Sequence, residues 1–326
     1  MPLHGGAKQR APADIPTYSQ EDMSESIIIL CPGQGAQHVG MGTAWHDASP
    51  VAAATFAEAD DVLGIALSKL CFEGPEDDLN RTDIAQAALY TASVASHRAL
   101  VDRGEIGDIV AAAGLSLGEF TALHLAGAFD FAAGLQLVRL RGQAMQEAAD
   151  TVESGMVALV GADEQQANEL CDAARGDAVL VPANFNCPGQ VVVSGAKAAC
   201  DRALNVAEKM GLRATALAVA GAFHSPVMQP AADRLAQAIE DIAWQAPTVP
   251  VVSNVTAEPH DASDIASIKR HLVEQLTSPV RWSDSMRWSI DNVESNFVEL
   301  APGKVLSGLM RRIDRGIKVR NFSEPS

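Results

Sequence analysis

The fold class follows from one stretch of the chain, Ile109-Val-Ala-Ala-Ala-Gly-Leu-Ser-Leu-Gly-Glu119. Its first five residues are small and apolar, which is typical of a buried strand in a parallel sheet. An apolar helical pattern follows over residues 120–127. Gly114 and Gly118 flank Ser116 and match the G-x-S-x-G pattern of a sharp elbow between a strand and a helix. The stretch predicts an α/β protein with a serine hydroxyl lifted off the sheet at a helix N-terminus.

The composition narrows the class of protein to which the chain can belong. The 326 residues are 48% hydrophobic and 20% charged, which indicates a globular protein of two domains, or of one domain with an insertion. No apolar run approaches the roughly 20 residues that span a bilayer, so we expect no membrane protein. The 24 basic and 41 acidic residues give a net charge of −17, which argues against a broad nucleic-acid surface.

The cysteines point to a reducing compartment. Their number, five, is odd, their spacing is scattered, and no C-x-x-C occurs. A disulfide framework or a zinc site is therefore not expected. The N-terminus has no uninterrupted apolar segment of the kind that marks a secretory signal. We expect a cytoplasmic protein that holds no metal.

Elements outside the elbow predict a two-part architecture. Residues 1–25 form a flexible tail by composition, and residues 321–326 form a short second tail. A large α/β-hydrolase-like domain with a parallel sheet takes up residues 26–152 and 221–320, and includes helical patterns over 43–70, 83–103 and 131–149. Residues 153–220 follow the order β-α-β-β-α-β of a ferredoxin-like subdomain, with the last strand expected at 214–219.

A serine nucleophile needs a base, and eight histidines compete for that role. His224 stands out because it lies in the small-residue stretch Ala220-Gly-Ala-Phe-His-Ser-Pro226, a loop between a strand and a helix. An ordinary hydrolase would also place an acid between Ser116 and His224, in a loop after a parallel strand. The inserted subdomain occupies that interval instead, which argues against ordinary hydrolase topology.

Six collinear motifs, spread from about residue 26 to residue 320, carry a family resemblance. Together they resemble the malonyl-CoA:acyl carrier protein transacylases of type II fatty acid synthesis and the related acyltransferase domains of polyketide synthases. The motifs are Pro32-Gly-Gln-Gly-Ala-Gln37, Gly114-Leu-Ser-Leu-Gly-Glu119, Val138-Arg-Leu-Arg-Gly-Gln-Ala-Met145, Asn184-Phe-Asn-Cys-Pro-Gly-Gln190, Ala222-Phe-His-Ser-Pro-Val-Met228 and Ala301-Pro-Gly-Lys-Val-Leu306.

The resemblance implies a ping-pong mechanism and the residues that carry it. Ser116 would take the malonyl group from CoA as an ester, with His224 as the general base. The partner of His224 would be the backbone carbonyl of Gln275 rather than a carboxylate. Backbone N–H groups of Gln34 and Leu117 would form the oxyanion hole.

The resemblance also implies how the acyl group is chosen. Arg141 would pair with the malonyl carboxylate, since a buried carboxylate needs a partner and a guanidinium offers two parallel hydrogen bonds. Arg139 would face elsewhere on the same helix. Phe223 would crowd an α-methyl group and so disfavour methylmalonyl. Asn186 and Gln190 match positions near the pocket, where they either hold the loop or contact the substrate.

The implied partners are malonyl-CoA, as substrate, and acyl carrier protein; no cofactor is implied, and we expect a monomer. Carrier proteins are acidic as a class, so this acidic chain needs a local basic docking patch, for which Arg281, Arg287 and the basic cluster over 304–320 are candidates. We expect Glu119 to be a helix N-terminal acid rather than a catalytic group, and Cys187 to be inert.

Three alternatives remain open from the sequence. A discrete acyltransferase acting in trans for a polyketide pathway would use the same chemistry. A malonyl-CoA hydrolase would use the same serine elbow and release free malonate. An inactive scaffold would bind carrier protein only, although intact Ser116, Arg141 and His224 argue against it.

Overall fold

A parallel sheet forms the centre of the large domain. The computed structural model describes residues 26–325, and the predicted tail over 1–25 lies outside them. Five strands pair in the order β7-β2-β1-β8-β9, and every pairing is parallel. Their bounds are β1 Ile27–Cys31, β2 Ile109–Gly114, β7 Val251–Val252, β8 Asn296–Leu300 and β9 Val319–Phe322.

Strand β1 shows why its sequence is apolar throughout. Ile27 and Ile29 belong to the core shared with the helices on one face of the sheet. Ile28 and Leu30 belong to a second core on the other face. Since helices cover both faces, no position of the strand meets water, and the run predicted as a buried parallel strand is one.

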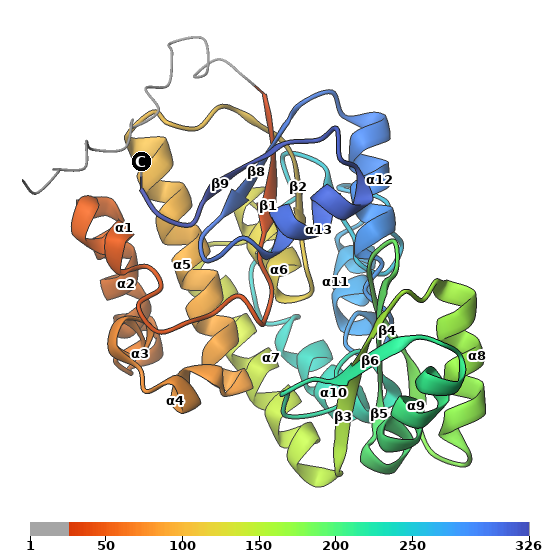
Figure 1. Ribbon diagram of the computed structural model, residues 1–326. Helices are drawn as coiled ribbons and strands as arrows, with labels where there is room; N and C mark the ends of the chain where they lie inside the picture. Colours follow the sequence, from red (N-terminus) through yellow and green to blue (C-terminus); the bar gives the residue numbers. More distant parts are fainter. Residues whose placement is uncertain (1–25, 326) are drawn as a thin grey trace, which may run out of the picture.

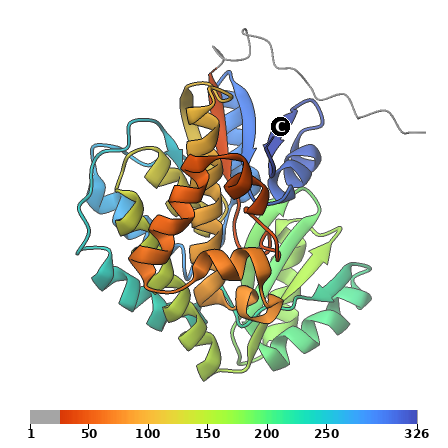
Figure 2. The same cartoon turned by 90° about the vertical axis from the view of Figure 1, so that its left-hand side faces the viewer.

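Helices cover the sheet on both sides (Figure 1). On one side lie the long helices α5 and α7, with α1 to α4 as an outer layer over α5 (Figure 2). The second core packs under α12 and α13. The bounds are α1 Thr43–Ala48, α2 Pro50–Leu63, α3 Leu67–Glu73, α4 Glu76–Asn80, α5 Thr82–Asp102, α6 Leu117–Leu125, α7 Phe131–Thr151, η2 Pro226–Met228, α10 Gln229–Ala238, α11 Ile265–Glu274, α12 Trp282–Asn292 and α13 Val305–Ile313.

A smaller antiparallel sheet is built from the segment inserted between α7 and η2. Its strands pair in the order β4-β5-β3-β6, the order of a ferredoxin-like fold. Helices α8 and α9 pack on it around a separate hydrophobic core, at the lower right of Figure 1. The elements are β3 Ser154–Val160, α8 Glu164–Arg175, β4 Leu180–Cys187, β5 Gln190–Ala196, α9 Lys197–Lys209 and β6 Arg213–Ala216.

One backbone bridge ties the two parts together. The N–H of Phe185 on β4 donates to the carbonyl of Val280 at 2.9 Å, and the N–H of Val280 donates to Ala183 at 2.8 Å. Val280 lies two residues before the start of α12 in the large domain, so the small sheet is extended by one residue of the large domain. This contact fixes the edge of the cleft between the two sheets.

Three sequence expectations need correction. The helical pattern over 43–70 is split into α1, α2 and α3, because Pro50 starts a new helix and Gly64 ends it in a left-handed conformation. The strand expected at 214–219 ends at Ala216, and residues 217–220 line a cavity instead. The supposed tail at 321–326 begins inside β9, where Phe322 is buried.

The burial of Phe322 yields a stability prediction. Its ring is 2% exposed in the main core, and its carbonyl accepts a hydrogen bond from Trp45 at 3.2 Å. We expect Phe322→Ala to lower the free energy of unfolding by about 3–5 kcal/mol, as cavity-forming Phe substitutions do. Urea unfolding followed by circular dichroism measures it. Deletion of residues 324–326 is the control, and an equal loss in both variants would contradict the assignment of Phe322 to the core.

Candidate active site

Ser116 occupies a strained turn between β2 and α6. Its backbone φ is 52° and its ψ is −104°, a conformation that L-residues rarely adopt. The turn fits only because Gly118 has no side chain, since a Cβ there would lie 2.1 Å from the carbonyl oxygen of Cys31. The strain and the tight packing are those of the elbow predicted from sequence.

Asn254, which the sequence did not single out, holds this elbow from behind. Its Oδ1 accepts a hydrogen bond from the backbone N–H of Ser116 at 2.6 Å. Its Nδ2 donates to the carbonyl of Gly114 at 2.7 Å. The side-chain amide therefore provides hydrogen-bond partners for backbone groups on both sides of the turn, which buried N–H and C=O groups require. Its residue type gave no signal, because one asparagine after β7 resembles any loop residue.

Gln34 and Leu117 are the residues expected to supply the oxyanion hole. Leu117 is the first residue of α6, so its N–H has no acceptor within the helix. The loop carrying Gln34 packs against the elbow so closely that a Cβ on Gly33 would lie 2.3 Å from the carbonyl oxygen of Leu115. Both residues line the same cavity as Ser116. Within residues 26–325 neither N–H has a hydrogen-bond acceptor, so both are available to an oxyanion.

His224 lies against the serine hydroxyl. Its Nε2 is 2.9 Å from Ser116 Oγ, and its Nδ1 is 2.7 Å from the backbone carbonyl of Gln275. The carbonyl only accepts, so Nδ1 carries the proton and Nε2 presents its lone pair to the hydroxyl. Burial, and then the positive charge of Arg141, lower the pKa of His224 to about 4. The ring is therefore neutral at pH 7 and can accept a proton.

Arg141 is a buried cation that has no carboxylate partner within residues 26–325. It projects from α7 and is 1% exposed. Its Nη1 donates to Gln86 Oε1 at 2.6 Å, and its Nη2 donates to Ser116 Oγ at 3.0 Å and to Gln275 Oε1 at 2.8 Å. Its Nε has no partner within the described residues. Burial lowers the pKa of Arg141 to about 9, which leaves the guanidinium charged at neutral pH.

The cavity over these groups lies between the two parts of the chain. Its volume is about 380 Å³. Phe223, Asn186 and Gln190 line it as expected, while Gln86 is a lining residue that the sequence did not indicate. Both parts contribute polar and apolar residues, and the apolar ones from the small subdomain are Met156, Val192, Leu217, Ala218, Val219 and Ala220.

Glu119 makes buried hydrogen bonds beyond those expected of a helix N-terminal acid. It does lie in the first turn of α6, but it is fully buried and its carboxylate accepts hydrogen bonds from the side chain of Gln275 and the backbone of Asn254. It does not line the cavity. Cys187 does line a hydrophobic core, its thiol is free, and burial raises its pKa.

The basic patch expected on the surface is only partly assembled. Arg311, Arg312 and Arg315 line a second cavity beside Pro188, and Arg312 Nη1 approaches Gln190 Oε1 at 3.4 Å, next to the first cavity. Arg281 instead forms ion pairs with Asp284 at 2.7 Å and with Glu164 at 3.7 Å. Arg311 and Arg312 at the end of α13, with Arg315 just beyond it, are therefore the better candidates to bind an anionic partner.

The site combines a strained serine, a neutral histidine, free N–H donors and a buried guanidinium. It lies between a parallel sheet and a ferredoxin-like insertion. Together these features define an acyl-transferring enzyme. The chain belongs to the acyl transferase domain family, which matches residues 28–322.

Relatives of known name cover nearly the whole chain. The malonyl CoA-acyl carrier protein transacylase of Bacillus subtilis is 40% identical over 92% of this chain and 94% of its own length. The crystal structure of the malonyl-CoA:acyl carrier protein transacylase of Xanthomonas oryzae superposes with a TM-score of 0.89 at 42% identity, over 93% of this chain and 96% of the other. A malonyl-transacylase solved in complex with its type II polyketide acyl carrier protein superposes with a TM-score of 0.87 at 39% sequence identity. The match covers 93% of this chain and 97% of the other.

The pKa of His224 can be tested on the site alone. A fluorophosphonate should label Ser116, and His224→Ala should slow labelling by at least about 100-fold, the usual contribution of a general base. Because the lowered pKa leaves the ring neutral above pH 4, the rate should be flat from pH 6 to 8 and fall only below about pH 5. Intact-protein mass against time measures it, and a midpoint at the ordinary histidine value of 6.5 would contradict the assignment.

Proposed function

We propose that this enzyme transfers the malonyl group from malonyl-CoA to the phosphopantetheine thiol of acyl carrier protein. One observation carries the choice of acyl group. The guanidinium of Arg141 lines the cavity, 3.0 Å from the serine hydroxyl, and within residues 26–325 its hydrogen bonds go only to neutral oxygens. An acyl chain that ends in a carboxylate would supply the missing partner, and a neutral chain would leave the cation unpaired.

In the first half-reaction, Ser116 Oγ attacks the thioester carbonyl while its proton moves to His224 Nε2. The developing oxyanion is stabilised by the N–H groups of Gln34 and Leu117. The carbon–sulfur bond then breaks, and His224 returns the proton to the leaving CoA thiolate. A malonyl ester of Ser116 remains, with its free carboxylate held by Arg141.

The second half-reaction repeats these steps with a different thiol. The phosphopantetheine thiol gives its proton to His224 and attacks the ester carbonyl. The same N–H groups stabilise the second tetrahedral intermediate. Collapse breaks the ester bond, and Ser116 Oγ takes the proton back. A thioester is already an activated acyl group, so each step uses only groups of this chain, and we propose no cofactor.

The cavity walls bear on the hydrolase alternative. Apolar residues from the small subdomain, including Met156 and Val192, line the same cavity as Ser116. They reduce the room for an attacking water while the ester waits for a thiol. Phe223, 6% exposed beside His224, narrows the same space and favours malonyl over its α-methyl homologue.

The pathway is proposed as fatty acid synthesis. A discrete polyketide acyltransferase is the second candidate, favoured by the likeness to the transacylase solved with its type II polyketide carrier protein. We also propose a cytoplasmic location, since all five cysteines are free and buried, as in reducing compartments. A monomer is proposed as well. No helix within residues 26–325 is long and apolar enough to cross a membrane.

Arg141 can be tested against a matched arginine on the same helix. Wild type incubated with malonyl-CoA should gain one malonyl group on Ser116 and pass it to carrier protein. Arg141→Ala should slow malonylation on the order of 10²–10⁴-fold, because two charge-assisted bonds of about 1.5–3 kcal/mol each are lost. Intact-protein mass under single turnover measures this.

Arg139 is the control, since it pairs with Asp83 at 3.0 Å and does not line the cavity. Arg139→Ala should malonylate within a few-fold of wild type. Equal losses in both variants would contradict the role given to Arg141. Release of CoA and free malonate without a lasting adduct in wild type would favour the hydrolase.

Docking of the carrier protein generates a separate prediction. The combined substitution Arg311→Glu, Arg312→Glu and Arg315→Glu should raise the apparent KM for carrier protein severalfold, and the effect should weaken as salt is added. Arg175→Glu on α8 is the control, because Arg175 is exposed but lines neither cavity. An unchanged KM in the triple variant would rule out this patch.

A further inference from the structure

A buried carboxylate lies behind the serine, on the side away from the cavity. Glu119 Oε1 is 2.7 Å from His260 Nε2. Glu119 Oε2 accepts hydrogen bonds from Gln275 Nε2 at 2.7 Å and from the backbone N–H of Asn254 at 3.0 Å. Neither Glu119 nor any of these three partners lines the cavity, so the mechanism above makes no direct use of this carboxylate.

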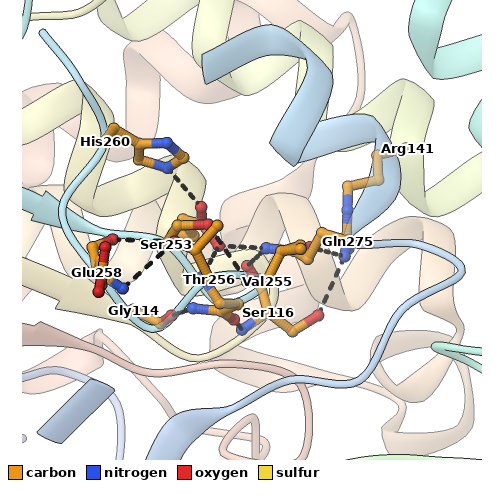
Figure 3. A network of polar contacts seen from close by, with 11 residues as sticks. Gly114, Ser116, Arg141, Ser253, Val255, Thr256, Glu258, His260 and Gln275 are labelled. Carbon is orange, nitrogen blue, oxygen red and sulfur yellow. Dashed lines mark hydrogen bonds and ion pairs between the residues drawn. The ribbon is translucent and has the colours of Figure 1, made fainter. Parts of the chain in front are cut away.

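The orientation of the Gln275 side chain follows from its neighbours. Its Oε1 faces the Nη2 donor of Arg141, and its Nε2 faces the carboxylate of Glu119. The opposite orientation would set an NH₂ group against a guanidinium and an oxygen against a carboxylate, which satisfies neither. The amide therefore bridges a buried cation and a buried anion. Figure 3 shows its contact with Arg141.

Gln275 contacts both the proposed base, His224, and the proposed carboxylate-binding residue, Arg141. Its backbone carbonyl holds Nδ1 of His224, and its side-chain oxygen holds Arg141. Its Nε2 also donates to the carbonyl of Ser116 at 3.1 Å. A small rotation of this residue would thus change the alignment of the base, of the carboxylate-binding group and of the elbow together.

Asn254 gives the same carboxylate a second route to the serine. The N–H of Asn254 is bonded to Glu119, while its side chain bridges Ser116 and Gly114. His260 completes the cluster from the loop after β7; its other ring nitrogen, Nδ1, has no partner within the described residues, so the ring places its proton on Nε2, toward the carboxylate.

We propose that Glu119, held by His260, is a positioning residue for acyl transfer: through Gln275 it sets Arg141 and His224 in register, and through Asn254 it holds the Ser116 elbow. This inference rests on the proposed function, because it assumes that Arg141 receives the malonyl carboxylate. Loss of a residue that aligns Arg141 should change the preference for malonyl over acetyl, whereas loss of a residue that only stabilises the fold should not.

The test is the rate of Ser116 acylation by malonyl-CoA relative to acetyl-CoA, which lacks the carboxylate. Glu119→Gln keeps the shape of the side chain but presents an NH₂ group on one side, so it no longer serves His260, Gln275 and Asn254 together. We expect the malonyl-to-acetyl ratio to fall about tenfold, which corresponds to about 1.4 kcal/mol. Intact-protein mass under single turnover measures both rates, and circular dichroism checks folding.

Glu299 offers a matched control. It is also a fully buried carboxylate, but it accepts from the backbone N–H groups of Leu306 and Ser307 at the start of α13, away from the serine. Glu299→Gln should lower the melting temperature and leave the malonyl-to-acetyl ratio at the wild-type value. The comparison separates the loss of any buried carboxylate from the loss of this one.

His260 provides a second, independent pair of variants. His260→Gln retains an N–H donor for Glu119 and should keep the ratio near that of wild type. His260→Leu removes the donor and should lower the ratio in the same direction as Glu119→Gln. This pair decides the question if Glu119→Gln fails to fold.

Each outcome bears on the proposal. An unchanged ratio in the folded variants would overturn it, because a fall of both rates together would show an effect on Ser116 and His224 without the alignment of Arg141 that the proposal requires. A raised ratio would also overturn it, because removal of a competing anion would then have freed Arg141 rather than misaligned it. If wild type itself gains no malonyl adduct, the proposed function fails, whereas a malonylated wild type with unresponsive variants rejects only this inference.

Discussion

The site is organised around a permanent positive charge held out of water. Arg141 is 1% exposed, and its contacts with Gln86, Ser116 and Gln275 are all to neutral oxygens. A buried ion without a counter-ion carries a desolvation penalty of several kcal/mol. The counter-charge nearest in the hydrogen-bond network is Glu119, one amide away through Gln275. That spacing satisfies the cation partly, which suits the proposed role of Arg141 as the partner of a substrate carboxylate.

This constraint explains why the histidine has a carbonyl partner in place of an acid. A carboxylate beside His224 would lie close enough to Arg141 to pair with it and would compete with the substrate for the guanidinium. The carbonyl of Gln275 fixes the tautomer of His224 without adding charge. The low pKa that burial and Arg141 impose on His224 keeps the ring neutral before substrate binds.

The sequence was sufficient for the groups whose chemistry depends on a local pattern. Ser116 was predicted from two glycines, and the ferredoxin-like insertion from the order of its elements. His224 was only favoured among eight histidines until the family resemblance was considered, because what selects it is contact with a residue 108 positions away. The structure brings Ser116, His224, Arg141 and the carbonyl of Gln275 together in the arrangement the resemblance implied.

Other features were beyond the sequence because they depend on tertiary contacts. Asn254 and Gln86 have common residue types in unremarkable surroundings, and only the fold places one behind the elbow and the other beside Arg141. Glu119 was read as a helix acid because its partners come from segments more than 130 positions away. Residues 321 and 322 were assigned to a tail instead of to β9, because a short C-terminal run gives no sign of the core it enters until β8 provides an edge.

The most direct test of this account is a crystal structure of the Ser116→Ala variant with malonyl-CoA bound. The account predicts both oxygens of the malonyl carboxylate within about 2.7–2.9 Å of guanidinium nitrogens of Arg141, with the thioester carbonyl oxygen directed at the N–H groups of Gln34 and Leu117. A carboxylate lying in solvent at the cavity mouth, with Arg141 still bonded only to neutral oxygens, would contradict it.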